Sequence, residues 1–331
     1  MSQMNTQSYR VRFRSFGLFL VLAFLLPCVM AQTAWPSRPV RLVVPFPPAG
    51  TSDVAARLVG EPLTKALHQP FIVENRPGAN GNIGMSETAR AAPDGHTFVV
   101  SVSGTLVVNR YLYPKLGFDI EKDFVPVSLM LRSPLVVVVP SSSPVGSLTQ
   151  LIARAKASPK SVTYGSPALG STSHLAAELL AMRAGVQLTH VPYKGSAPML
   201  QDLLAGQLEM AVDTLASSMP HIRSGKLRAL AVTSAKPVQA LPGVPTAGSV
   251  LPGFEAEGWI AMMAPANTPI PIVQRMSAQV NATLLDPALG QQWQQLGVEP
   301  VGGGPELLKE TIITESRKWK EVVTRTGVKL E

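Results

Sequence analysis

Short apolar segments typical of strands alternate with amphipathic segments typical of helices along most of this chain. This alternation predicts an α/β fold, because parallel strands need a long crossover between them, usually a helix. The strand-like segments are residues 41–44, 71–74, 96–101, 135–139, 162–164, 188–192, 208–213, 227–233 and 259–264. The helix-like segments are residues 54–67, 85–91, 148–157, 173–184, 199–205, 272–284 and 305–324. We therefore expect largely parallel sheets, and the uninterrupted apolar run 135–139 predicts a strand that is buried on both faces.

The N-terminus has the order of a secretory signal peptide. Three arginines between residues 10 and 14 precede the apolar run 16–26, and Val29 and Ala31 occupy the −3 and −1 positions of a cleavage site. We expect residues 1–31 to be removed near Ala31 and the mature protein to be periplasmic. A membrane anchor is the alternative, but the apolar run is short and ends at Pro27, which makes it a poor membrane span.

Cys28 is the only cysteine, and it lies within the predicted signal peptide. It could be a lipid-attachment site, but Pro27 is a poor fit to the small residue expected before such a cysteine, so we favour a soluble mature protein. Removal of residues 1–31 takes away three arginines and no acidic residue, so the net charge falls from +8 to +5 (8 − 3). The remaining basic residues are scattered, which argues against nucleic acid and suits a small anion.

The first strand is followed by an unusual turn, PFPPAGTSD, over residues 45–53. Gly50 permits backbone geometry that other residues resist, and Thr51 or Ser52 could cap the following helix. Asp53 falls in the first helical turn, where the helix dipole favours a carboxylate. The turn could be a connector, or it could hold a ligand against the helix N-terminus, and the residues alone leave both possibilities open.

A related turn, GSPALGST, covers residues 165–172. It matches the spacing G-x-x-x-x-G, but Ser171 stands where a nucleotide-binding loop requires lysine, so an NTPase is not indicated. The helix N-terminus favours an anion, and the hydroxyls of Ser171, Thr172 and Ser173 suit a carboxylate. Spacing alone slightly favours helix capping over ligand contact.

No catalytic or metal-binding pattern stands out. The five histidines are widely separated and none forms a metal-ligand pair, and no G-x-S-x-G motif is present. We therefore expect no enzyme activity, no metal and no cofactor. One alternative is an exported serine hydrolase that uses Ser171 or Ser173 with His174.

The chain resembles the Bug family, the receptors of tripartite tricarboxylate transporters, from about Trp35 to the C-terminus. Several loose motifs occur in the family's order, and together they make the resemblance specific. They are WPSRPVRLVVPFPPAGTSDVAARL, VENRPGANGNIG, AAPDGHTF, DFVPVSL, YGSPALGSTSHLAAELL, HVPYKGSAPMLQDLLAGQLEMAVD, SGKLRALAVTS and APANTP.

The resemblance implies a two-lobed fold like that of type II periplasmic binding proteins. Each lobe would be a mainly parallel sheet flanked by helices, with a ligand cleft between the lobes. Residues 32–132 and 255–331 would form lobe 1, and residues 133–254 would form lobe 2. The proline- and glycine-rich stretch 235–258 suits a crossing between lobes.

The resemblance also implies a receptor that captures a small organic carboxylate by lobe closure. The carboxylate could be a dicarboxylate, a tricarboxylate, an acidic amino acid or an aromatic acid. We expect a monomer that delivers this ligand to a transporter of the tripartite tricarboxylate type. A signalling sensor is the alternative partner.

The family's two ligand-binding loops map onto the two unusual turns. The family often has Gly-Gly where this chain has Ala49-Gly50, so the methyl group of Ala49 departs from the family's pattern in the first loop. By resemblance, the ligand-binding residues are Phe46, Pro48, Ala49, Gly50, Thr51, Ser52 and Asp53 in the first loop, Ser103 and Thr105 in the floor, Ser166, Gly170, Ser171, Thr172 and Ser173 in the second loop, and Asp213.

Overall fold

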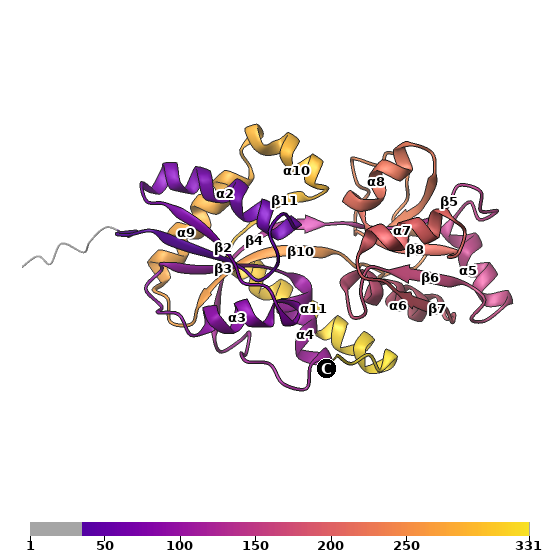
Figure 1. Ribbon diagram of the computed structural model, residues 1–331, viewed down its shortest axis with the longest axis horizontal. Coiled ribbons are helices and arrows are strands. Elements are labelled where there is room, and N and C mark those ends of the chain that lie inside the picture. The colour runs from indigo at the N-terminus through magenta and orange to yellow at the C-terminus, as the bar shows by residue number, and fades with distance from the viewer. Residues whose placement is uncertain (1–34, 331) are drawn as a thin grey trace, which may run out of the picture.

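The computed structural model describes residues 35–330, so the predicted signal peptide and Cys28 lie outside the described residues. The described chain forms two α/β lobes that lie side by side, each built on its own sheet (Figure 1). The two-lobed fold predicted from the sequence is therefore confirmed.

Lobe 1 contains a six-stranded sheet in the order β11-β4-β10-β3-β1-β2. Its strands are β1 (Val40–Val44), β2 (Phe71–Asn75), β3 (Thr97–Val102), β4 (Phe124–Ser133), β10 (Gly258–Pro265) and β11 (Glu299–Gly303). The pairings of β1 with β2 and β3 are parallel, whereas β10 pairs antiparallel with β3 and β4, and β11 pairs antiparallel with β4. Strands β1 to β4 consequently all run toward lobe 2.

Successive residues of β1 bury their side chains on opposite faces of this sheet, as expected of a strand in a central position. Leu42 joins the core that includes Val59 and Met276, whereas Val43 joins the core that includes Met85 and Trp319. The helices of lobe 1 are α2 (Thr51–Leu67), α3 (Asn82–Ala89), α4 (Asn109–Leu112), α9 (Ile270–Leu284), α10 (Gly290–Leu296) and α11 (Pro305–Thr326).

Lobe 2 contains a five-stranded sheet in the order β7-β6-β8-β5-β9. Its strands are β5 (Leu135–Pro140), β6 (Thr163–Ser166), β7 (Thr189–Pro192), β8 (Met210–Thr214) and β9 (Leu227–Val232). Its helices are α5 (Leu148–Ala157), α6 (Thr172–Ala184), α7 (Ser196–Leu204) and α8 (Leu215–Arg223). Strand β5 is buried along its whole length, as its uninterrupted apolar sequence predicted.

Both sheets are mixed rather than mainly parallel. The expected parallel pairings occur within β1–β3 and within β6–β8, where helices connect successive strands. Antiparallel pairings occur at β4, β10 and β11 in lobe 1 and at β5, β8 and β9 in lobe 2. The antiparallel part of each sheet therefore contains the strands through which the chain changes lobe.

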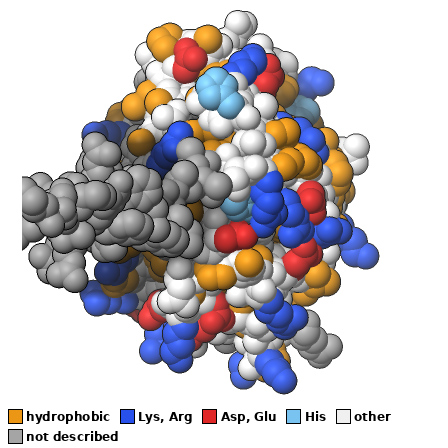
Figure 2. All heavy atoms as spheres, turned by 90° about the vertical axis from the view of Figure 1, so that its left-hand side faces the viewer, with side chains coloured by type: hydrophobic (Ala, Val, Ile, Leu, Met, Phe, Trp, Pro, Cys, Tyr) orange, Lys and Arg blue, Asp and Glu red, His pale blue; other side chains and the backbone are white. Residues whose placement is uncertain are grey.

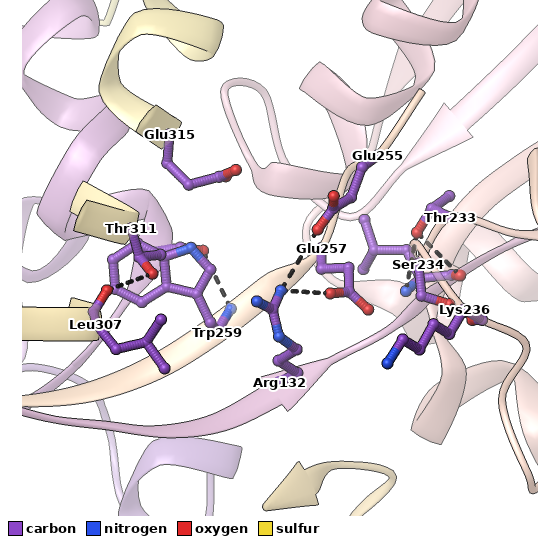
Figure 3. Close-up of polar contacts among 12 residues, drawn as sticks. Arg132, Thr233, Ser234, Lys236, Glu255, Glu257, Trp259, Leu307, Thr311 and Glu315 are labelled. Carbon is purple, nitrogen blue, oxygen red and sulfur yellow. Dashed lines mark hydrogen bonds and ion pairs between the residues drawn. The ribbon is translucent and has the colours of Figure 1, made fainter. Parts of the chain in front are cut away.

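The chain crosses between the lobes twice. The first crossing is short, at Pro134 between β4 and β5, and the second covers residues 233–257 between β9 and β10. We propose these two segments as the lobe boundaries. The crossings are fastened to each other, because Arg132 Nη1 donates to Glu257 Oε2 at 2.7 Å and contacts Glu255 Oε1 at 3.5 Å (Figure 3).

The lobes also contact each other away from the crossings. One buried apolar cluster includes Leu106 and Trp319 of lobe 1 together with Leu175 and Leu179 of lobe 2. A second contact joins Gly297, at the end of α10, to Ala216 of α8. A Cβ added to Gly297 would lie 2.7 Å from Ala216 Cβ and 2.9 Å from its backbone nitrogen. The absence of a side chain at Gly297 therefore permits this approach of the two lobes.

Acidic and basic side chains lie beside one another on the end of lobe 1 that Figure 2 shows, outside the grey atoms. Ion pairs in this lobe include Arg38 with Asp94 and Arg41 with both Glu74 and Glu87. Among residues 35–330, no helix is both long and apolar enough to span a membrane.

We predict that Gly297→Ala changes the spacing of the lobes. Gly297 has φ 68°, so alanine there costs about 1–2 kcal/mol of left-handed strain, and its Cβ also collides with Ala216. Gly185→Ala is the matched control, because Gly185 ends a helix with φ 65° and its added Cβ would meet nothing within 4 Å. Small-angle scattering should give a changed radius of gyration for Gly297→Ala only. Identical scattering curves for the two variants would contradict this contact.

Candidate functional site

The loops at the carboxyl ends of β1, β2 and β3 meet at one edge of lobe 1. A Cβ added to Gly81, after β2, would lie 3.3 Å from Phe46 Cζ and 2.7 Å from Thr105 Oγ1. Thr105 Oγ1 also donates to the carbonyl oxygen of Asn80 at 3.0 Å. The structure thus brings the first predicted loop next to the predicted floor. In open α/β sheets the carboxyl ends of the strands are where ligands bind.

Lobe 2 has an equivalent edge, formed by the loops after β6, β7 and β8. Tyr193 N donates to the carbonyl oxygen of Ser166 at 3.0 Å, and Gly195 N donates to that of Pro167 at 2.7 Å. Ser196 Oγ donates to Asp213 Oδ1 at 2.6 Å. These contacts connect the second predicted loop to Asp213 through residues 193–196, a segment to which the sequence analysis assigned no part of the site.

The two edges face each other at residues 103–105, the predicted floor of the ligand site. A Cβ added to Gly104, in the π-helical turn η2 (Gly104–Val108), would lie 3.9 Å from Thr172 Oγ1 at the start of α6. Ser103 Oγ accepts a hydrogen bond from Trp259 N of β10 at 3.4 Å, so the floor is also attached to a crossing strand. Trp259 in turn lines a cavity of about 280 Å³ beside Arg132 and Glu257 (Figure 3).

Helix α2 begins without a side-chain cap. Its N-cap is Gly50, which contradicts the prediction that Thr51 or Ser52 caps it. The reason is that Ala49 adopts φ 67°, which turns the chain into the helix before Thr51 is reached. Within residues 35–330, no hydrogen bond takes up the first three helical N–H groups, those of Thr51, Ser52 and Asp53. These donors are unpaired at the edge that faces lobe 2.

The carboxylate of Asp53 braces the first loop from inside. It accepts hydrogen bonds from Ala49 N at 2.9 Å, from Arg57 at 3.0 and 3.1 Å, and from Asn75 Nδ2 at 2.9 Å. Burial opposes ionisation of Asp53, but these hydrogen bonds outweigh it and lower its pKa. Arg57 is thereby engaged with Asp53, and Asn75 Nδ2 also reaches the carbonyl oxygen of Phe46.

Helix α6 begins with a side-chain cap. Ser171 Oγ accepts the N–H of His174, so the capping interpretation of Ser171 is confirmed. No hydrogen bond within the described part of the chain takes up the N–H groups of Thr172 and Ser173. Gly170 N donates to His174 Nδ1 at 3.1 Å, so this amide supports the loop's own conformation.

A cluster of stacked aromatic rings lies beneath the second loop. The sequence analysis did not predict this cluster, because its members lie far apart in the chain. The rings of His174 and His190 stack 4.0 Å apart, and His190 stacks on Tyr164. Ser166 Oγ lies 2.7 Å from His190 Nε2. Burial, with a smaller effect of His190, lowers the pKa of His174 to about 3, and burial lowers that of His190 to about 4. Both rings are therefore neutral at neutral pH.

The geometry gives no support to the hydrolase alternative. Among the described residues, no hydrogen bond joins the hydroxyl of Ser171 or Ser173 to the imidazole of His174, whose Nδ1 instead accepts from Gly170. A nucleophile needs a positioned base. Residues 35–330 also contain no group of three or more His, Cys, Asp or Glu side chains that could hold a metal ion.

Asp213 is fully buried at the end of β8. Its carboxylate accepts hydrogen bonds from Ser196 Oγ and, at 3.4 Å, from Ser218 Oγ, and it forms no ion pair with a described residue. Burial raises its pKa, and the hydrogen bonds from Ser196, Thr214 N and Ser218 only partly oppose this effect.

We predict that Asp213→Asn stabilises the folded protein more at about pH 8 than at about pH 4. A carboxyl whose folded pKa is raised favours folding at low pH and loses that advantage as the pH rises through the folded pKa. Urea unfolding at the two pH values measures the difference. Asp94→Asn is the control of opposite sign, because the hydrogen bonds from His96 N and Arg38 outweigh burial and lower the pKa of Asp94. It should lose stability mainly at the higher pH. A pH-independent effect of Asp213→Asn would contradict the prediction.

Comparisons with known proteins agree with this architecture. The family model described as "Tripartite tricarboxylate transporter family receptor" matches residues 55–328. Protein BugT of Bordetella pertussis is 38% identical over 317 residues, which cover 95% of this chain and 97% of BugT.

Two solved structures are similar to the chain in both fold and sequence. Rpa4515 of R. palustris, solved with adipate, has a TM-score of 0.76 and 39% identity, covering 88% of this chain and 98% of that one. MatC of Rhodopseudomonas palustris, solved with bound malate, has a TM-score of 0.72 and 33% identity, covering 87% of this chain and 100% of that one. The chain therefore belongs to the tripartite tricarboxylate transporter receptor family, which consists of periplasmic solute-binding proteins.

Proposed function

We propose that this receptor captures a small dicarboxylate between its two lobes and delivers it to a membrane transporter of the tripartite tricarboxylate type. The observation that carries the proposal is the pair of helix N-termini, α2 and α6, on facing edges of the lobes. Together they present five N–H groups for which the described residues offer no acceptor, those of Thr51, Ser52, Asp53, Thr172 and Ser173.

A carboxylate matches such donors well. Its two oxygens accept several hydrogen bonds, and a helix N-terminus favours negative charge. A dicarboxylate could place one carboxylate near each helix. Two relatives of the same fold were solved with adipate and with malate, both dicarboxylates, which supports this class of ligand.

Recognition in this proposal relies on amides and hydroxyls rather than on an arginine. Arg57, in the helix that follows the first loop, is already bonded to Asp53. We assign Asp53, Ser103, Ser166 and Gly170 to positioning the loops, because each makes hydrogen bonds within the protein.

The remaining predicted residues would line the ligand. Thr51, Ser52, Ser171, Thr172 and Ser173 would donate to it, with Phe46 and Pro48 as apolar walls and with Thr105 and Asp213 supporting the two edges. Ala49 would shape the first loop through its left-handed backbone rather than through its exposed methyl group.

Delivery to a partner would follow from lobe closure. Binding between two lobes favours the closed arrangement, and the closed surface is what a transporter or, alternatively, a signalling sensor would recognise. The predicted signal peptide would place this encounter in the periplasm, where receptors of the family act.

We predict that Ser171→Ala and Thr172→Val weaken binding of adipate or malate by about 1–3 kcal/mol, because each removes a hydroxyl next to the proposed carboxylate. Isothermal titration calorimetry on the mature protein measures the effect. Ser147→Ala is the matched control, since Ser147 caps α5 in the same lobe through the same contact that Ser171 makes for α6. Weakening that is equal in Ser147→Ala and Ser171→Ala would mean that lost capping, rather than ligand contact, explains the result.

We also predict that ligand affinity changes less than about twofold between about pH 6.5 and about pH 8. The pKa values of His174 and His190, about 3 and about 4, keep both rings neutral throughout this interval, so the second loop gains no charge. Calorimetry over the interval tests this. A steep rise in affinity toward the lower pH would contradict the prediction and would mean that a group at the site, one of these histidines or Asp213, takes up a proton.

A further inference from the structure

A second cavity lies between the lobes, away from the proposed ligand site. Its volume is about 740 Å³, within the range of small-molecule pockets. Lobe 2 contributes α8 and residues 238–240 to its walls, and lobe 1 contributes α10 and the start of β11. None of the residues predicted to bind the carboxylate lines it.

The sheet order places this cavity across the crossing strands from the proposed site. In lobe 1, β1 and β3 lie on one side of β10 and β4, and β11 lies on the other side. In lobe 2, β6 and β7 lie on one side of β5, and β9 lies on the other. Figure 1 shows α8 and α10 as neighbours above the crossing segments.

The walls of the cavity are mostly apolar. Leu215 and Val238 belong to the core of lobe 2, and Trp293 and Val298 belong to the core of lobe 1. The indole N–H of Trp293 is buried and has no hydrogen-bond partner among the described residues. An apolar molecule in the cavity would contact side chains from the cores of both lobes at once.

The charged groups lie at the margins of the cavity. Arg223, at the end of α8, lines the cavity and forms no ion pair with any residue between 35 and 330. Several other arginines of the molecule do form ion pairs with acidic side chains. Glu299 also lines the cavity. Its negative charge helps to raise the pKa of Glu257, so Glu299 lies on the side of the cavity toward Glu257 and Arg132. The margin at Arg223 is the one that suits an anion.

We propose that this cavity is a second binding site, for a small molecule with an apolar body and one anionic group at Arg223. Because both lobes line the cavity, a rotation of the lobes about the crossing segments changes the spacing of α8 and α10. An occupant is thereby coupled to ligand binding at the other side of the crossings, and the coupling is reciprocal. The site is independent of the proposed function and can be tested without it.

The test uses two fluorescent probes with the same ring system, 1-anilinonaphthalene-8-sulfonate and the uncharged N-phenyl-1-naphthylamine. On the mature protein, we expect saturable binding of one molecule of each, with the sulfonate bound up to about fivefold more tightly through Arg223. Arg223→Gln should remove this preference and leave the neutral probe unaffected. Met219→Glu, which places a charge in the apolar wall, should weaken both probes at least about tenfold.

Arg183→Gln is the matched control, because Arg183 is an exposed arginine near the end of α6 and does not line the cavity. It should bind both probes like the unmodified protein. Equal binding of the sulfonate by Arg223→Gln and Arg183→Gln would overturn the assignment of the anionic group. Unchanged binding of both probes by Met219→Glu would overturn the site itself.

The coupling is tested by titrating the sulfonate probe with and without saturating adipate. We expect its affinity to change at least about threefold while one molecule still binds. One-for-one displacement by adipate would place the probe at the carboxylate site and overturn the proposal, and an unchanged affinity would overturn the coupling. If adipate itself does not bind by calorimetry, the proposed function fails, whereas the variants still decide the fate of the second site.

Discussion

A helix cannot satisfy its own first N–H groups, and this constraint underlies the proposed function. In α2 those donors follow a glycine N-cap with no side-chain cap, and in α6 the serine cap takes only the third of them. The surrounding structure then holds the donors in place: Asp53 braces one loop and His174 braces the other. The buried polar groups of the two loops therefore bond mainly within the protein, and the unpaired amides are the donors that we propose for a carboxylate.

The two crossings between lobes determine how the rest of the molecule is connected. Because β4 and β10 lie within the sheet of lobe 1 rather than at its edge, the lobes have contacts on both sides of the crossings. One side carries the facing edges near Gly104 and Thr172, and the other carries the contact of Gly297 with Ala216 beside the second cavity. Arg132 and Glu257 tie the crossings together between these regions. A change of lobe spacing on one side therefore involves the other.

Sequence patterns identified nine of the eleven strands in the described residues, among them β5, β9 and β10 in the antiparallel parts of the two sheets. Short apolar runs marked these strands, whereas two strands and three helices were missed. These are β4, which contains Pro126, the four-residue helix α4, α8, which is rich in serine and contains Pro220, the short helix α10, and the glycine-rich β11. Their local propensities are weak, and packing against the other lobe or sheet stabilises them. The capping prediction for Thr51 or Ser52 failed for a related reason, since Asp53 and Asn75 hold Ala49 in a backbone conformation that alanine disfavours.

The sequence by itself determined the class of fold, the two unusual turns and their chemistry, because apolar periodicity, proline, glycine and hydroxyl residues act over a few neighbouring positions. Resemblance to the receptor family then joined those turns into one predicted site. Only the tertiary structure decided which polar groups are engaged with the protein, such as Asp53 with Arg57 and Ser166 with His190. It alone also decided that α8 and α10 enclose a cavity between the lobes. Those outcomes depend on contacts between residues far apart in the chain, and no local pattern records such contacts.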